Sequence, residues 1–154
     1  MPMRLGTPMP DLSGATEWLN GSLQPEEFKG APTLVHFWAV SCHICHETMP
    51  DLIRYRDEWI GQGLKIVGVH MPRQESDTDI EKVKQDINTY GITHLVGVDN
   101  RHTVASAFQN EYVPAFFLFD HNGNLYFRAA GDKGFERLKP KLDSMMQDYL
   151  SSQA

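Results

Sequence analysis

A pair of cysteines stands where a predicted strand turns into a predicted helix, and this junction constrains the fold more than any other feature. Residues 33–39 are mostly apolar and β-prone, which is typical of a buried strand. Residues 43–60 then have apolar side chains at helical spacing. Cys42 lies between these two segments, and Cys45 lies just inside the second. The strand therefore leads the first cysteine to the start of a helix and the second about one turn further on.

The other patterns predict an α/β fold. The predicted strands are 16–20, 33–39, 64–70, 95–98, 115–120 and 125–129, and the predicted helices are 43–60, 79–90, 102–108 and 135–150. Strands that alternate with helices indicate parallel neighbours with helices on both faces, and the hairpin around residues 121–124 adds an antiparallel edge. A chain of 154 residues suits a single domain, 1–154, in which the Pro- and Gly-rich extension 1–31 packs on the core.

Charge and hydropathy narrow the functional classes. The formal net charge of −6, without any basic cluster, argues against binding to nucleic acid or to an anionic membrane. Arg4 is the only basic residue near the start, and no apolar stretch follows it, so the pattern of a secretory signal is missing. No segment approaches the roughly 18 apolar residues that a membrane span needs. We expect a cytoplasmic monomer.

The spacing of the two cysteines favours chemistry over structural support. A disulfide that closes so small a ring adds little stability, and in a reducing compartment a close pair is more often catalytic or metal-binding. At a helix N-terminus, backbone N–H groups and the helix dipole stabilise a thiolate. We therefore expect Cys42 to be the nucleophile and Cys45 to resolve the mixed disulfide. No cofactor is needed, because electrons pass through sulfur.

Several motifs extend beyond the cysteines. Phe-Trp-Ala precedes the pair at 37–39, and Tyr-Val-Pro precedes the apolar strand at 112–114. With these motifs the chain resembles the thioredoxin superfamily. The chain is similar to the ResA/TlpA-like branch in having Pro50 and the additional segment 70–91. Within that branch it resembles the YkuV-type cytosolic group, with which it shares segments 69–73 and 108–115.

This resemblance implies a thioredoxin fold, with a central mixed sheet flanked by helices on both faces and a helical insert between the second and third main strands. It also implies a thiol–disulfide oxidoreductase that acts as a reductase in the cytosol. Its partners would be protein dithiols or disulfides and an upstream thiol reductant. In this family pattern Pro114 is a cis-proline against the disulfide, and Val113 offers its backbone to a substrate strand.

Three positions differ from the family pattern. Ser41 stands where a Trp usually precedes the first cysteine, and Ile44 stands where a Pro is common. Thr48 occupies a position where the exported branch often has a Glu. These differences argue against the specialised redox role of the exported branch.

Three further residues are candidates for tuning the dithiol. His43 lies between the cysteines and could lower the pKa of the Cys42 thiol, unless it is a solvent-exposed helix residue. His36 stands where thioredoxins keep a buried acid, and an ordinary histidine pKa would suit a general base near neutral pH. The alternative is a core histidine that binds a backbone carbonyl. Trp38 is expected to contribute packing more than chemistry.

Other functions compete with this interpretation. Cys42 and Cys45 could bind zinc or copper together with His36, His43 or His46, although a closed zinc site needs four ligands. The string Cys-His-Ile-Cys-His also matches the attachment pattern for c-type haem, which the absence of an export signal disfavours. A thiol peroxidase would need a single peroxidatic cysteine, whereas here a second cysteine lies only three positions after Cys42, and the residues before Cys42 do not match. The acidic residues Asp77, Asp79 and Glu81 are predicted to form a solvated capping face, and the polar residues Asp99, Asn100, His102 and His121 to lie in turns and caps.

Overall fold

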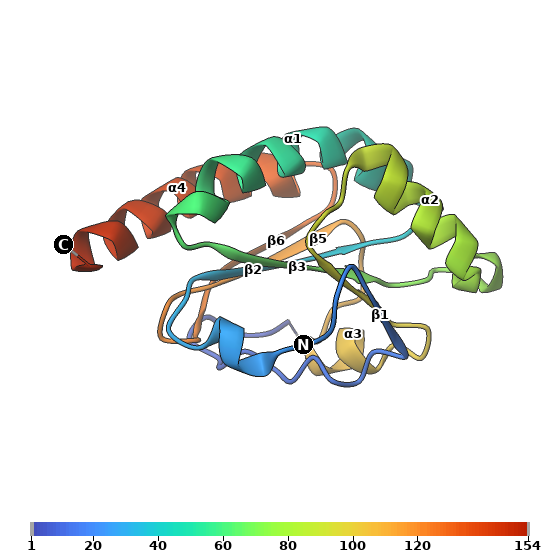
Figure 1. Ribbon diagram of the computed structural model, residues 1–154, viewed down its shortest axis with the longest axis horizontal. Helices are drawn as coiled ribbons and strands as arrows, with labels where there is room; N and C mark the ends of the chain where they lie inside the picture. The colour runs from blue at the N-terminus through green and yellow to red at the C-terminus, as the bar shows by residue number, and fades with distance from the viewer. Residues whose placement is uncertain (1, 154) are drawn as a thin grey trace.

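The computed structural model describes residues 2–153 and contains a six-stranded sheet (Figure 1). Its strands are β1 (Glu17–Leu19), β2 (Thr33–Trp38), β3 (Lys65–His70), β4 (Leu95–Val98), β5 (Ala115–Phe119) and β6 (Leu125–Ala130). Its helices are α1 (His43–Trp59), α2 (Ile80–Tyr90), α3 (Thr103–Ala107) and α4 (Gly134–Gln153), with 3₁₀ turns η1 (Pro25–Phe28), η2 (Ile60–Gln62) and η3 (Glu75–Thr78). Each element that the sequence predicts is present, with ends shifted by a few residues at most.

The sheet is mixed, and its order is β1-β4-β3-β2-β5-β6. Strands β2, β3 and β4 run parallel, while β1, β5 and β6 pair antiparallel with their neighbours. Strand β2 lies inside the sheet, and all six of its residues are buried. The structure therefore confirms the expected mixed sheet and its antiparallel hairpin.

Helices cover both faces of this sheet. Figure 1 shows α1, α2 and α4 above the strands, and α3 with the N-terminal segment below them. Because side chains alternate along a strand, β2 supplies Leu34 and Trp38 to the upper cluster and Val35 and Phe37 to the lower one. Each such buried side chain contributes about 1.5–3 kcal/mol of hydrophobic free energy. His36 shares the upper face with Leu34 and Trp38.

The N-terminal segment lies against the lower face and contacts the sheet on both sides, at β4 and at the start of β6. Met3 and Leu12 are buried in the lower cluster. Strand β1 pairs with β4, and a bridge joins Pro8 to Asn124. None of the described helices has the length and apolarity to cross a membrane.

The parallel strands determine where a site can form. Trp38, at the end of β2, pairs with His70, at the end of β3. Two parallel strands thus end at the same edge, which is where open α/β sheets usually place their functional groups. The loop after β2 leads into α1, and the loop after β3 leads into η3 and α2.

Candidate active site

The two cysteines form a disulfide at the start of α1. Their Cα atoms are 5.2 Å apart. Cys42 is the N-cap residue of the helix, and the backbone N–H of Cys45 donates a hydrogen bond to its Sγ at 3.1 Å. In this oxidised form the cysteines are 3% and 2% exposed, respectively. The first sulfur therefore lies where the helix N–H groups can stabilise a thiolate, as the sequence predicts.

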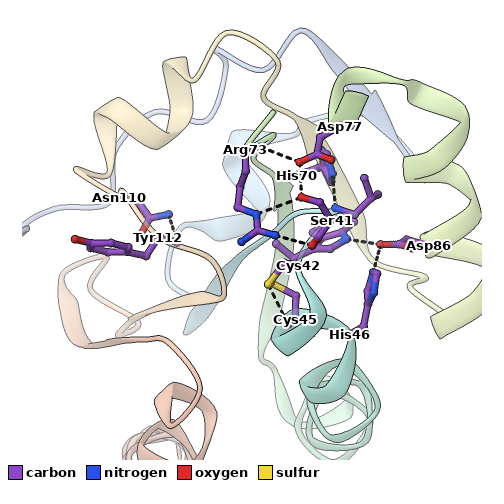
Figure 2. Close-up of a disulfide and its surroundings, with 12 residues drawn as sticks. Ser41, Cys42, Cys45, His46, His70, Arg73, Asp77, Asp86, Asn110 and Tyr112 are labelled. Carbon is purple, nitrogen blue, oxygen red and sulfur yellow. Dashed lines mark hydrogen bonds and ion pairs between the residues drawn. A yellow bond between two sulfur atoms is a disulfide. The ribbon is translucent and has the colours of Figure 1, made fainter. Parts of the chain in front are cut away.

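A charged clamp holds the turn that precedes Cys42 (Figure 2). Arg73 donates to the Ser41 carbonyl at 2.5 Å and to its hydroxyl at 3.2 Å. The Ser41 hydroxyl donates to Oδ2 of Asp77 at 2.7 Å, and the Arg73 backbone N–H donates to the same oxygen at 2.9 Å. The loop after β3 is thereby joined to the residue before the nucleophilic position.

The prediction that Asp77 belongs to a solvated face is wrong. Its side chain is buried, because it accepts hydrogen bonds from the two loops that meet here. Burial alone raises the pKa of a carboxyl, but the Ser41 and Arg73 hydrogen bonds, with the charge of Arg73, bring the Asp77 pKa below its usual value. Asp79, by contrast, is the N-cap of α2, as predicted.

His70, at the end of β3, supports the same turn. Its ring is fully buried, and its Nε2 accepts a hydrogen bond from the backbone N–H of Val40 at 3.1 Å. Burial lowers its pKa to about 4, so the ring is neutral near neutral pH. The Nδ1 atom has no hydrogen-bond partner within residues 2–153.

Trp38 links the sheet to the inserted helix α2. Its indole Nε1 donates to Asp86 at 3.0 Å, and the His46 ring meets the same carboxylate oxygen at 2.8 Å. The His46 ring also stacks on Tyr90, with ring centroids 5.1 Å apart. Trp38 is buried between the rings of His36 and His70. Trp38 is therefore mainly a packing residue, as expected, and it also makes one hydrogen bond, to Asp86.

His36 is buried behind the resolving cysteine, but its surroundings differ from the expectation. Burial, together with the positive charge of Arg56, lowers its pKa to about 3. The prediction of an ordinary histidine pKa near neutrality is therefore wrong. Its Nε2 lies 2.8 Å from Nε2 of His94, so its partner is a second imidazole and not a backbone carbonyl.

The loop that contains Pro114 lies beside this histidine. The Val113–Pro114 peptide bond is cis, as the resemblance implies. Pro114, His36 and Cys45 all line one small cavity of about 10 Å³. Val113 is half-buried, and its neighbour Tyr112 is 65% exposed. Figure 2 shows Tyr112 on the loop opposite the disulfide.

His43 has a more exposed position than the other histidines. Its side chain is 85% exposed, and its Nε2 pairs with Glu47 at 2.6 Å, one turn along α1. The three candidate metal-binding histidines thus face different partners: His36 faces His94, His43 faces Glu47, and His46 faces Asp86. No group of three potential ligands occurs among residues 2–153.

Several site residues were not predicted from the sequence. Asp86 and His94 belong to no recognisable motif, and nothing in the sequence distinguishes Arg56 from other polar residues of its helix. His70 could have been found, because it ends the strand parallel to the one that leads into the cysteines. The Asp99 cap was predicted correctly: its carboxylate accepts hydrogen bonds from Val104 and Ala105 N–H at the start of α3.

Comparison with known proteins agrees with this geometry. The model of the AhpC/TSA family matches residues 5–128. The chain is 42% identical over 147 residues to thiol-disulfide oxidoreductase YkuV of Bacillus subtilis (strain 168), covering 95% of this chain and 99% of that protein. It is 23% identical over 137 residues to thiol-disulfide oxidoreductase ResA of Bacillus anthracis, covering 89% and 76%.

Solved structures show the same fold. A thioredoxin-like protein in the oxidised form, determined in solution, has a TM-score of 0.87 and 41% identity, covering 95% of this chain and 99% of that one. A thiol:disulfide interchange protein DsbE from Chlorobium tepidum has a TM-score of 0.80 at 18% identity, covering 94% and 99%, and supports the fold alone. With its disulfide at the start of α1, this chain belongs to the AhpC/TSA family and is a thiol–disulfide oxidoreductase of the thioredoxin fold.

Proposed function

We propose that this oxidoreductase reduces disulfides in protein substrates in the cytoplasm and is recharged by an upstream thiol reductant. The observation that supports this proposal most is the hydrogen bond from the Cys45 N–H to Cys42 Sγ at the start of α1. The same N–H stabilises the thiolate that appears when the disulfide opens. A reducing compartment then sets the net direction toward substrate reduction.

The two cysteines have different roles in this scheme. In the reduced enzyme the Cys42 thiolate attacks a substrate disulfide, and one substrate sulfur leaves as a thiolate. Cys45, after losing its proton, attacks Cys42 in the mixed disulfide and releases the second substrate sulfur. The enzyme disulfide seen here is the product, and two thiols of the reductant restore the dithiol. The pairing of two close cysteines favours this exchange over single-cysteine peroxidase chemistry.

The surface around the disulfide fits an extended peptide. Ile44, between the cysteines, and Tyr112, before the cis-proline loop, are large hydrophobic residues that remain exposed, at 37% and 65%. Val113 and Pro114 follow directly, and the backbone of Val113 is the expected partner for a substrate strand. We infer that an unfolded or extended substrate segment binds here. Ile44 and Tyr112 would then make apolar contacts on the two sides of the substrate's disulfide.

The clamp formed by Arg73, Ser41 and Asp77 is proposed, together with His43 and Trp38, to tune the reactivity of Cys42. Arg73 binds the residue next to Cys42 and adds positive charge near the thiolate. His43 adds further positive charge when it is protonated, although its exposure and its pairing with Glu47 weaken the effect. Trp38 fixes the end of β2 through its bond to Asp86.

Activity assays with single-cysteine variants test this proposal. We expect the unmodified chain to reduce insulin in the presence of dithiothreitol, and Cys42→Ser to abolish the activity. Cys45→Ser should lose turnover but retain a long-lived mixed disulfide, which mass spectrometry detects. A redox titration of the unmodified chain should show one two-electron transition. Full activity in both single variants would refute the proposed roles.

A further inference from the structure

Three buried polar side chains form a row that ends behind the resolving cysteine. Arg56 on α1 approaches Nδ1 of His94 with its Nη1 at 3.3 Å. Nε2 of His94, just before β4, lies 2.8 Å from Nε2 of His36 on β2. The three residues are 7%, 7% and 1% exposed. Water cannot readily take part in these contacts, so the protons must be arranged among the side chains themselves.

The arginine determines where each proton lies. A guanidinium group only donates hydrogen bonds, so Nδ1 of His94 must be the acceptor and has no proton. Burial lowers the pKa of both histidines, and the Arg56 charge lowers them further, so both rings are neutral and have one proton each. The His94 proton is therefore on Nε2 and is donated to Nε2 of His36. This leaves the His36 proton on Nδ1.

The backbone is shaped to hold this row. Asn20 donates to the carbonyls of Ile92 and His94 at 2.7 and 2.9 Å, which fixes the loop before β4. Arg56 also donates to the Gly91 carbonyl at 3.3 Å. At Gly68 on β3, an added Cβ would lie 2.9 Å from Nε2 of His36, so the absence of a side chain makes room for the contact between the two rings.

The last ring of the row reaches the active site. His36 and Cys45 line the same cavity of about 10 Å³, close to the smallest volume that holds one water molecule. We propose that Arg56 and His94 are positioning residues that keep His36 as an Nδ1–H donor toward this cavity. There it stabilises the thiolate of Cys45. This inference rests on the proposed exchange reaction and assigns a role to two residues outside the cysteine motif.

The donor has its largest effect when the enzyme is recharged. A reductant thiolate attacks Cys42 Sγ, a new sulfur–sulfur bond forms, and the Cys42–Cys45 bond breaks with its electron pair going to Cys45. His36 donates a hydrogen bond to this leaving thiolate and keeps its own proton, while water later protonates the sulfur. In the same tautomer, Nδ1 of His36 cannot remove the proton from a Cys45 thiol, because it already has one. The row thus favours His36 as a hydrogen-bond donor and not as the general base that the sequence suggested.

Nuclear magnetic resonance tests the tautomers directly in the unmodified protein. Two-bond proton–nitrogen correlation spectra should show His36 protonated at Nδ1 and His94 protonated at Nε2, both neutral at neutral pH. The opposite tautomer of His36, or a protonated ring, would overturn the inference. If the same protein fails to reduce insulin, the proposed function fails while this tautomer result stands, so the two failures are distinguishable.

Variants of His94 test the link to Cys45. The glutamine side chain accepts from Arg56 with its oxygen and donates to His36 with its nitrogen, so His94→Gln preserves the polarity of the row, whereas His94→Leu does not. In a Cys42→Ser background, ultraviolet absorbance of the thiolate reports the Cys45 pKa. We expect His94→Leu to raise this pKa by about one unit, a tenfold loss of thiolate, and His94→Gln to restore it. Equal pKa values in all three proteins would refute the role of the row.

Discussion

Removing the Asp77 carboxylate should loosen the turn that presents Cys42. The change Asp77→Ala removes a buried carboxylate whose Oδ2 accepts two hydrogen bonds, from the Ser41 hydroxyl at 2.7 Å and the Arg73 N–H at 2.9 Å. It also leaves the Arg73 N–H without its acceptor in a part-buried place. The loss therefore combines weaker bonding with the cost of an unpaired donor.

The structure allows the magnitude to be worked out. A hydrogen bond to a charged group contributes about 1.5–3 kcal/mol. Because the two bonds share Oδ2 and are not independent, their sum is nearer the value of one strong bond plus part of a second, about 3 kcal/mol. Asp77→Asn keeps an oxygen at this position and loses mainly the charge, so we expect about 1 kcal/mol. For a chain of this size, 3 kcal/mol corresponds to a decrease in Tm of roughly 6–12 °C.

Urea unfolding, followed by tryptophan fluorescence, measures these differences. Asp79→Ala is the matched control, since it removes an exposed carboxylate two residues away that caps α2 and should cost about 1 kcal/mol. A Ser41→Ala variant and the double variant close a cycle, and their coupling energy isolates the 2.7 Å bond. A change below about 0.5 kcal/mol for Asp77→Ala would mean that the side chain is solvated, as the sequence suggested.

The pH dependence of the same variants gives a signed test. The Asp77 pKa is lower in the folded state than in the unfolded state, so its contribution is fully present above the unfolded pKa of about 3.9. As the pH falls through the folded pKa, the carboxylate is protonated and this contribution disappears. The stability gap between the unmodified chain and Asp77→Asn should therefore shrink below about pH 4. A gap that widens on acidification would contradict the assignment.

Three other substitutions have outcomes that the structure determines. Asp86→Ala leaves the buried indole N–H of Trp38 unpaired and should lower the free energy of unfolding by about 2 kcal/mol, with Asp86→Asn intermediate in urea unfolding. Gly68→Ala places a methyl group against Nε2 of His36 and should cost about 1–3 kcal/mol and shift the imidazole signals, whereas unchanged spectra would refute the close packing. His43→Ala should raise the pKa of the nucleophilic thiol by about half a unit in ultraviolet titrations, and no shift would make this residue a simple exposed helix position.

Local patterns were sufficient to predict the α/β order of elements and the cysteine geometry, whereas the thioredoxin fold itself followed from the resemblance. Six buried residues in β2 and the helical periodicity of α1 bring Cys42 to a helix N-terminus without any long-range information. The cis form of Pro114 followed from resemblance, since no local pattern specifies the isomer. These features depend on neighbouring residues or on a motif, and both are visible in a single sequence.

The polar network behind the site depends on contacts between distant segments. His36 and His94 are 58 positions apart in the chain, and Ser41 and Asp77 are 36 apart. An acidic loop residue is exposed in most proteins, so composition alone favoured the wrong environment for Asp77. The ordinary histidine pKa assumed for His36 failed for a related reason, because burial and Arg56 arise only when α1 packs on the sheet.

The reactivity of the reduced cysteines tests the central claim most directly. The fully reduced protein is alkylated with iodoacetamide over a range of pH, and peptide mass mapping assigns the modified residue. We predict that Cys42 reacts first and with a pKa at least about one unit below the usual thiol value near 8.5, while Cys45 reacts slowly. Preferential alkylation of Cys45, or a Cys42 pKa at or above 8.5, would contradict a thiolate stabilised by the start of α1.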